Sequence, residues 1–363
     1  MKFSLYLNAQ SPDGDHDLDV ITAVTEQALL ADRAGFAGVC LTEHHFTGYN
    51  TYGNPFTFGA YLAPQLHNLH TIISVAVPAL WNPLNFAEAC NTLDLLTRGR
   101  CTIGIGTGGS PREYEGLGRD TGDRAALMEE VLDVAFRALA KTDGDGIDVD
   151  ATTTHSTGKL TRRIMPSSYS PRIKFARASL SDSGVLDAAR RGWALQTARE
   201  DLAETARKWA LYHGALDAAG HDLETLRAAR DWSLVQKMVY VGETDEAARR
   251  EVEPALDYLD TSTAKAFSGV AGSASFQNGV VGVAASDRQA FLDKAMIVGS
   301  PDTVATEIDR YRQAGIGHLA LLFLYGQMDP AQSMRSLRRF VDEIMPRFAG
   351  SAAPANVPVR AGR

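Results

Sequence analysis

The chain has 363 residues, 45% of them hydrophobic and 22% charged, and its formal net charge is -8. These proportions are typical of a globular protein with a large core, and the negative balance argues against a nucleic-acid partner, which clustered cations would bind. The apolar runs, such as residues 319–325, are too short to cross a bilayer, and the chain turns polar by Asn8 without forming a signal-peptide core. Cys40, Cys90 and Cys101 form no C-x-x-C pair, which predicts buried, inert thiols in a cytoplasmic protein.

Eight short apolar segments alternate with segments of helical periodicity along the chain. They predict strands at residues 3–7, 38–42, 71–77, 101–105, 173–176, 193–197, 233–241 and 319–323. The segments are apolar throughout rather than alternating, which is typical of parallel strands that are covered on both faces.

The intervening segments carry signals for the beginning and end of helices. Residues 127–139 repeat apolar side chains at helical spacing, and Ser300-Pro301 is a typical helix start. Gly35, Gly192 and Gly315 each stand where a helix should end before a strand. Eight such repeats favour an α/β fold of the (β/α)8 TIM-barrel type with insertions, and a doubly wound open sheet is the alternative.

Two insertions and a tail interrupt the repeats. Residues 141–171 lack apolar periodicity and predict a long loop, and the glycine-rich residues 261–286 predict a second loop that acts as a lid. We expect one domain over residues 1–348 and a disordered tail over 349–363.

The first chemical signal is Thr42-Glu43-His44-His45-Phe46, directly after the second expected strand. The carboxyl ends of barrel strands line the active site, so Glu43, His44 and His45 are candidate catalytic residues. We expect no metal, because neighbours on a strand point to opposite faces and no third ligand lies nearby in the sequence. The alternative is that these side chains only hydrogen-bond the loop.

The second signal is the segment between the fifth strand and its helix. Hydroxyls beside the N–H groups of a helix start can hold a phosphate, although ordinary helix capping would need the same residue types. The candidate residues here are Ser179, Leu180, Ser181, Ser183 and Gly184. Gly104-x-Gly106-x-x-Gly109 also fits a dinucleotide pattern, but Pro111 and a polar turn stand where a helix should open.

Several stretches resemble the bacterial luciferase-like, reduced-flavin-dependent monooxygenases. They are Glu43 to Thr47 followed by Gly53-Asn54-Pro55-Phe56, then residues 93–118 and residues 298–304. The resemblance implies a cytoplasmic barrel enzyme that uses FMN as FMNH2, supplied by a separate NAD(P)H:flavin reductase, and O2 as co-substrate, activated as a flavin C4a-peroxide. It also implies a homodimer that oxygenates a small organic molecule.

The resemblance assigns further residues to the flavin. It implies that the segment Ser179–Gly184 binds the FMN phosphate and that Gly106 and Thr107 lie beside the flavin. It also implies that Ser74 and Val75 support the ring through a non-proline cis peptide. Thr107 stands where the luciferase alpha chain has an arginine and Gly106 where it has a cysteine. The resemblance then implies either a lower flavin affinity or a substitute cation, for which Arg112, Arg177 and Arg199 are the candidates.

In this interpretation His44 exchanges a proton where flavin and substrate meet, while His45 and Glu43 hold it in place or aid flavin contact. Apolar side chains near the barrel mouth would exclude water: Phe46, Tyr49, Phe56, Phe58 and Trp81. Two alternatives stay open, an F420-dependent hydride-transfer oxidoreductase on the same barrel and a non-catalytic flavin-binding partner subunit. The sequence does not distinguish hydroxylation, Baeyer–Villiger insertion, desulfonation and aldehyde oxidation.

Overall fold

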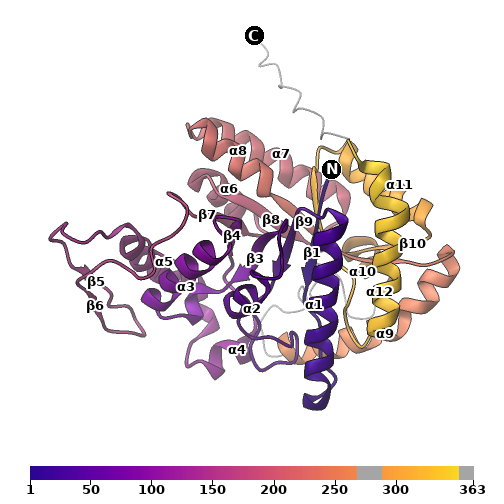
Figure 1. Ribbon diagram of the computed structural model, residues 1–363, viewed down its shortest axis with the longest axis horizontal. Helices are drawn as coiled ribbons and strands as arrows, with labels where there is room; N and C mark the ends of the chain where they lie inside the picture. Colours follow the sequence, from indigo (N-terminus) through magenta and orange to yellow (C-terminus); the bar gives the residue numbers. More distant parts are fainter. Residues whose placement is uncertain (268–287, 351–363) are drawn as a thin grey trace, which may run out of the picture.

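Eight parallel strands close into a barrel in the computed structural model, which describes residues 1–267 and 288–350 (Figure 1). Neighbouring strands pair in parallel around the ring, and the pairing of the sixth with the seventh barrel strand completes it. The predicted TIM barrel is therefore confirmed. In ring order the strands are β1 (Lys2–Leu7), β2 (Gly38–Leu41), β3 (His70–Ala76), β4 (Cys101–Ile105), β7 (Lys174–Ala178), β8 (Ala194–Ala198), β9 (Leu234–Val241) and β11 (His318–Leu322).

Each of the eight predicted strands overlaps one barrel strand. A further strand, β10 (Met296–Gly299), was not predicted; it pairs with the carboxyl half of β9, from Met238 to Val241. β8 and β11 pair with the amino half of β9, so β10 extends the sheet above β8 rather than entering the ring. β10 is only four residues long and is followed almost at once by α11, so its sequence shows no separate strand pattern.

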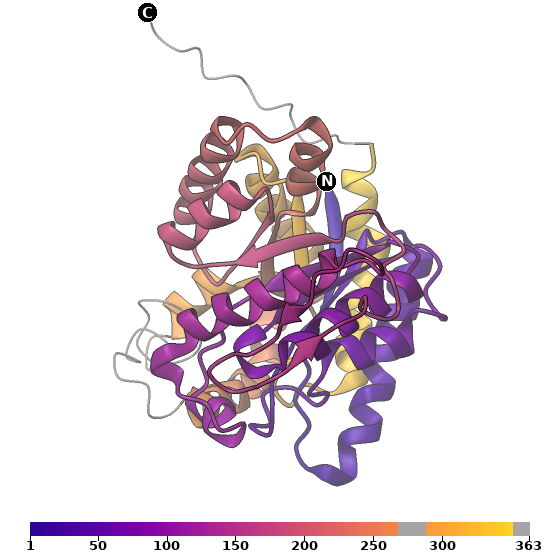
Figure 2. The same ribbon diagram turned by 90° about the vertical axis from the view of Figure 1, so that its left-hand side faces the viewer.

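Helices surround the strands on all sides (Figures 1 and 2). The predicted ends are confirmed: Gly35, Gly192 and Gly315 have φ of 86°, 69° and 82°, and Ser300 caps the amide of Thr303. The helices are α1 (Asp17–Ala34), α2 (Pro55–Leu62), α3 (Pro83–Leu96), α4 (Pro111–Gly116), α5 (Arg124–Ala140), α6 (Asp182–Arg191), α7 (Leu202–Ala218), α8 (Leu223–Trp232), α9 (Asp245–Phe267), α10 (Arg288–Ala295), α11 (Pro301–Gln313) and α12 (Pro330–Arg339).

The insertions differ in part from the prediction. Residues 141–171 contain a small antiparallel hairpin of β5 (Val149–Asp150) and β6 (Lys159–Leu160), which extends away from the barrel (Figure 1). The second loop was predicted to begin at residue 261, but α9 continues to Phe267. The rest of that predicted lid and residues 351–363 of the predicted tail lie outside the described residues.

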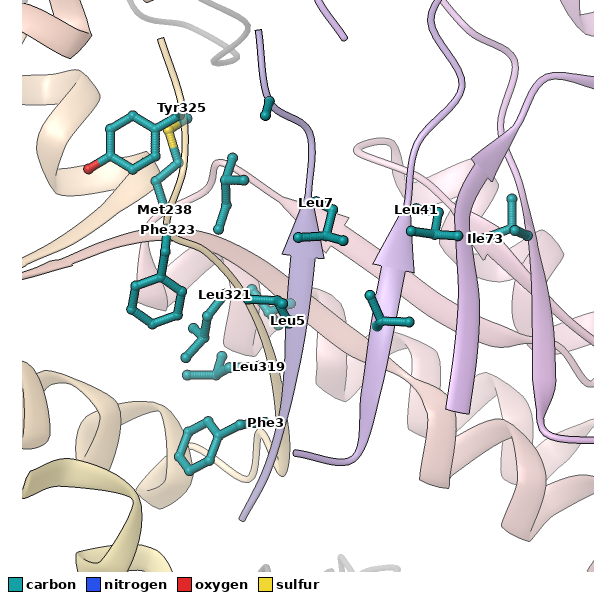
Figure 3. Close-up of a cluster of buried hydrophobic side chains, with 14 of the residues drawn as sticks. Phe3, Leu5, Leu7, Leu41, Ile73, Met238, Leu319, Leu321, Phe323 and Tyr325 are labelled. Atoms are coloured by element: carbon teal, nitrogen blue, oxygen red, sulfur yellow. The ribbon is translucent and has the colours of Figure 1, made fainter. Parts of the chain in front are cut away.

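Alternate residues of each strand face the two sides of the barrel wall. Phe3, Leu5 and Leu7 of β1 are buried under the helices beside Leu319 and Leu321 of β11 (Figure 3). The opposite faces supply a separate inner cluster, comprising Cys40, Ile72, Leu234 and Ala320, with Tyr6 and Trp232 packed against it. Cys40, Cys90 and Cys101 are buried free thiols, as predicted.

The amino-terminal end of the barrel is filled by aromatic and imidazole rings. Trp232 stacks on His70 with ring centroids 3.6 Å apart, and His70 Nε2 lies 2.9 Å from Thr102 Oγ1. His318 Nε2 lies 2.7 Å from Ser4 Oγ on the neighbouring strand. None of the described helices has the length and apolarity to cross a membrane.

Candidate active site

Both clusters of candidate residues lie on one rim of the barrel. Because all eight strands are parallel, their carboxyl ends share this rim. Residues 42–54 connect β2 to α2, and Ser179–Gly184 connects β7 to α6. The histidines and the expected phosphate cradle are therefore on the same side of the molecule.

Glu43 is a buried carboxylate that joins the ends of β2 and β3. Its Oε2 accepts the amide of Val77 at 2.9 Å, and its Oε1 accepts Trp81 Nε1 at 2.8 Å and His45 Nε2 at 2.9 Å. Burial alone would lower the pKa of His45, but the hydrogen bond and charge of Glu43 raise this pKa above its usual value. Glu43 and His45 thus form a structural ion pair beside the mouth.

His44 is held by Glu113, a residue that the sequence interpretation did not select. His44 Nδ1 lies 3.0 Å from Glu113 Oε1, and Thr47 Oγ1 donates to the same oxygen at 3.3 Å. The side chain of Glu113, on α4, is only 2% exposed. Glu113, rather than Glu43 or His45, is therefore the carboxylate that contacts His44. Since Nδ1 is committed to Glu113, Nε2 is the ring nitrogen that remains for chemistry.

Ser74, Val75, Gly106 and Thr107 come together where β3 and β4 end. The Ser74–Val75 peptide is cis, as the resemblance implied, and Tyr6 donates its hydroxyl to Ser74 O at 2.7 Å. A Cβ on Gly106 would lie 2.5 Å from Val75 Cγ2, so only glycine fits without displacing this valine. Thr107 O accepts the hydroxyl of Tyr114 at 2.5 Å.

At the start of α6, the hydroxyl of Ser181 lies within hydrogen-bonding distance of two other serine hydroxyls. Ser181 Oγ lies 3.1 Å from Ser183 Oγ and 3.3 Å from Ser179 Oγ, and it caps the amide of Gly184. A Cβ on Gly184 would lie 2.2 Å from Ser179 Oγ, so this glycine makes room for the hydroxyl. Ser181 and Ser183 are exposed, and Leu180, between Ser179 and Ser181, is half-buried. We call Ser179–Gly184 the hydroxyl cradle.

The three arginines considered as partners for an anion occupy different places. Arg112 is exposed on α4. Arg177 leaves the barrel wall toward α5 and α6, where its Nη1 lies 2.6 Å from Met128 Sδ. Arg199, directly after β8, reaches the rim and donates to the hydroxyl of Tyr49. Arg199 is therefore the arginine of the three that the fold brings to the mouth.

The expected apolar wall is present except at one position. Phe56 packs edge-to-face on Trp81 with centroids 5.3 Å apart, and Tyr49 and Phe58 are buried. Phe46 is 70% exposed and does not pack with these rings; it lines the cleft beside His44 instead. Its φ of 45° turns it away from the wall, and its ring lies against Gly116.

A cleft of about 440 Å³ borders His44, which is in the size range of sites for small molecules. The hydroxyl cradle is not part of its lining. The walls come from the β1–α1 connection, the β2–α2 connection and α9, and comprise Ser11, Pro12, Asp13, Asp17, His44, Phe46, Thr47, Gly48, Asn50, Thr51, Gly53 and Tyr258.

Comparison with known proteins identifies the class of this protein. Limonene 1,2-monooxygenase from Rhodococcus erythropolis is 27% identical over 331 residues, which cover 89% of this chain and 80% of that protein. A monooxygenase from Streptomyces bottropensis has the same fold, with a TM-score of 0.81 at 23% identity over 96% of this chain and all of the other. The oxygenating constituent of 3,6-diketocamphane monooxygenase from Pseudomonas putida, solved with FMN, has a TM-score of 0.73 at 21% identity, covering 96% and 98% of the two chains.

The named relatives are monooxygenases, and the two solved structures share the fold of this chain. More narrowly, the profile of the luciferase-like monooxygenases matches residues 1–318, and the chain belongs to this family. The resemblance identified in the sequence is thereby confirmed.

Proposed function

We propose that the protein is the oxygenase component of a two-component system, which uses FMNH2 and O2 to oxygenate a small organic molecule. One observation carries the proposal: a chain of contacts crosses the rim from the histidines to the hydroxyl cradle. His44 packs on Tyr49, Tyr49 accepts from Arg199, and the next residue, Glu200, pairs with Lys208, which donates to Leu180 O. A ligand held by the cradle would therefore extend toward His44.

The cradle fits the phosphate of FMN. Its three hydroxyls can donate to phosphate oxygens, and it opens a ten-residue helix whose first N–H groups favour an anion. Gly184 leaves the space that Ser179 Oγ needs. Ser179, Ser181, Ser183 and Gly184 would hold the phosphate, and Ser74, Val75, Gly106 and Thr107 would lie beside the ring. Bound reduced FMN would supply the electrons that activate O2.

His44 is the residue that we assign to proton exchange with the reacting molecules. Glu113 accepts from Nδ1, which fixes the ring and leaves Nε2 to donate or accept a proton on the ligand side. Glu43 and His45 hold the neighbouring wall, where the Trp81 and Phe56 rings exclude water. We assign the cleft beside His44 to the organic substrate.

The partner and the setting follow from the same proposal. The 3,6-diketocamphane enzyme is described as an oxygenating constituent, and we infer a similar division of labour here, with a separate NAD(P)H:flavin reductase. We also infer a cytoplasmic homodimer.

Turnover with different electron sources tests the proposal. The purified chain should consume O2 and oxygenate a substrate when it receives photoreduced FMN, or FMN with an added flavin reductase and NADH. NADH and FMN without the reductase should give no product. Binding of reduced F420 in preference to FMNH2 would favour the hydride-transfer alternative.

The variant His44→Ala separates an oxygenase from a silent flavin-binding subunit. We expect it to bind reduced FMN within about twofold of the wild type and to lose product about 100-fold, as removal of an acid–base group does. Unchanged product formation at saturating FMNH2 would remove His44 from the proposed chemistry. Absence of any product from the wild type across candidate substrates would favour the silent subunit.

A further inference from the structure

Arg199 stands on the rim in a backbone conformation that arginine rarely adopts. It directly follows β8 and has a φ of 60°, in the left-handed region. Non-glycine residues persist in this region only where their surroundings enforce it, and such positions gather at functional sites.

Two buried lysines fix the residue that follows Arg199. Lys208, on α7, pairs with the carboxylate of Glu200, and Lys237, on β9, donates to Glu200 O at 2.6 Å. Lys237 is fully buried, and its ammonium also donates to Lys294 O at 2.5 Å. Buried ammonium groups need such partners, so both lysines are committed to protein oxygens. Their contacts hold the turn from which Arg199 leaves the strand.

The Arg199 side chain lies against Tyr49, on the histidine side of the rim. Its guanidinium donates to the hydroxyl of Tyr49, and its Cζ lies 6.0 Å from the centroid of the Tyr49 ring. The same ring meets His44 edge-on, with centroids 4.7 Å apart. On the other side, Lys208 also donates to Leu180 O of the cradle at 2.5 Å. The fold thus places the Arg199 guanidinium on the ring that contacts His44, and Lys208 links the following residue, Glu200, to the cradle.

We propose that Arg199 binds an anionic group of the reduced flavin and supplies the positive charge that Thr107 lacks. This inference rests on the proposed function. Reduced FMN carries negative charge on its phosphate and on its reduced ring system, and a guanidinium binds either through charge-assisted hydrogen bonds. Tyr49 aligns the guanidinium for this contact, and Glu200, Lys208 and Lys237 position it.

Anaerobic binding titrations of Arg199→Asn and Arg199→Lys test the inference. Asparagine tolerates the left-handed conformation but removes the charge, whereas lysine retains the charge. We expect Arg199→Asn to raise the Kd of reduced FMN about 10- to 100-fold, the usual effect of losing a hydrogen bond to a charged group, and Arg199→Lys to raise it less. Arg112→Asn, which removes an exposed arginine of α4, is the matched control and should change this Kd less than twofold.

Oxidised FMN and reduced riboflavin identify which anion is bound. A loss that is equal in both oxidation states of FMN and absent for riboflavin assigns the charge to the phosphate. A loss that appears only with reduced flavins, including riboflavin, assigns it to the ring. Both outcomes support the inference, provided that circular dichroism shows the variants folded.

Wild-type affinity of Arg199→Asn for reduced FMN would overturn the inference while leaving the proposed function intact. So would a loss of affinity in Arg112→Asn instead. If the wild-type protein itself fails to bind reduced FMN, the proposed function fails, and the role of Arg199 fails with it.

Discussion

At the residue scale, two adjacent histidines find two different carboxylates. His45 pairs with Glu43, two residues away, whereas His44 pairs with Glu113, which is 69 positions away. Adjacency in the sequence predicted one cluster of three residues, and the sequence correctly placed it at a strand end. It could not show the second pair, because contact between the β2–α2 connection and α4 depends on how the barrel brings together the loops that follow β2 and β4. The available signal was an acidic residue on a short helix directly after a predicted strand.

The first prediction concerns Glu113 as a positioning residue. Glu113→Ala should lower kcat about 10- to 100-fold, because His44 loses the charged acceptor that orients its ring. The Kd of reduced FMN should stay within about twofold. Glu113→Gln keeps an acceptor oxygen and should recover part of kcat. Stopped-flow turnover and anaerobic titration measure the two quantities.

Glu115→Ala is the control, since Glu115 is exposed on the same helix. It should leave both kcat and Kd unchanged. If Glu113→Ala instead weakened flavin binding and kept kcat, Glu113 would serve the cofactor pocket rather than His44.

At the scale of elements, the sequence located strands better than connections. Strands such as β2 and β4 are buried along their whole length, so each is a mostly apolar run that is visible without the fold. Connections have no such constraint. The strands of the β5–β6 hairpin have only two residues each, too few to show a pattern, and α9 continues beyond the point where glycine and serine suggested a loop. The cradle was found because a serine-rich helix start has a recognisable local pattern.

The second prediction tests the cradle at Gly184. Gly184→Ala places a methyl group 2.2 Å from Ser179 Oγ and should displace this hydroxyl. We expect weaker binding of FMN by about tenfold, the loss of about one hydrogen bond to a charged group, with unchanged binding of riboflavin. Isothermal titration of both flavins measures the difference. Equal losses for FMN and riboflavin would contradict the assignment of the phosphate to the cradle.

Gly214→Ala is the matched control: it should leave flavin binding unchanged and increase the stability of the protein. Gly214 lies inside α7, and a Cβ there meets no atom within 4 Å. Alanine should stabilise the protein by about 0.5–1 kcal/mol, because it restricts the unfolded chain and favours helix. Urea unfolding checks this, and flavin binding should not change.

At the scale of the whole molecule, the number of repeats predicted closure of the barrel but not how its base is filled. Each of the eight β/α repeats has a local sequence pattern that can be recognised, and eight parallel strands form a closed ring. The contact between His70 and Trp232 joins residues that are 162 positions apart, and no local sequence pattern predicts it. Likewise, Ser4 meets His318 only because the first and last barrel strands are neighbours.

The third prediction concerns loss of stability in acid. Burial, with a smaller effect of the Lys2 charge, lowers the pKa of His318 to about 3, and burial also lowers the pKa of His70. In the unfolded chain a histidine has a pKa of about 6.5 and takes up a proton below this pH, whereas the buried histidine of the folded chain stays neutral. The free energy of unfolding therefore falls as the pH decreases below about 6.5. His318 should cost about 2 kcal/mol between pH 6.5 and pH 5.

Urea unfolding of His318→Gln at pH 7.5 and pH 5.0 measures this effect. The variant should lose about 2 kcal/mol less than the wild type between the two pH values, whatever its stability at pH 7.5. His67→Gln, at a position between α2 and β3, is the control. An identical loss in His318→Gln and the wild type would show that His318 takes up its proton equally in both states.

The stacked Trp232 and His70 rings have a kinetic consequence. Because these rings close the amino-terminal end of the barrel, flavin and substrate must enter from the carboxyl-terminal rim, where both the cradle and the histidines lie. Two ligands that share one opening cannot pass each other, so the ligand that binds deeper has to bind first and dissociate last. Steady-state kinetics should therefore show ordered rather than random binding of flavin and substrate.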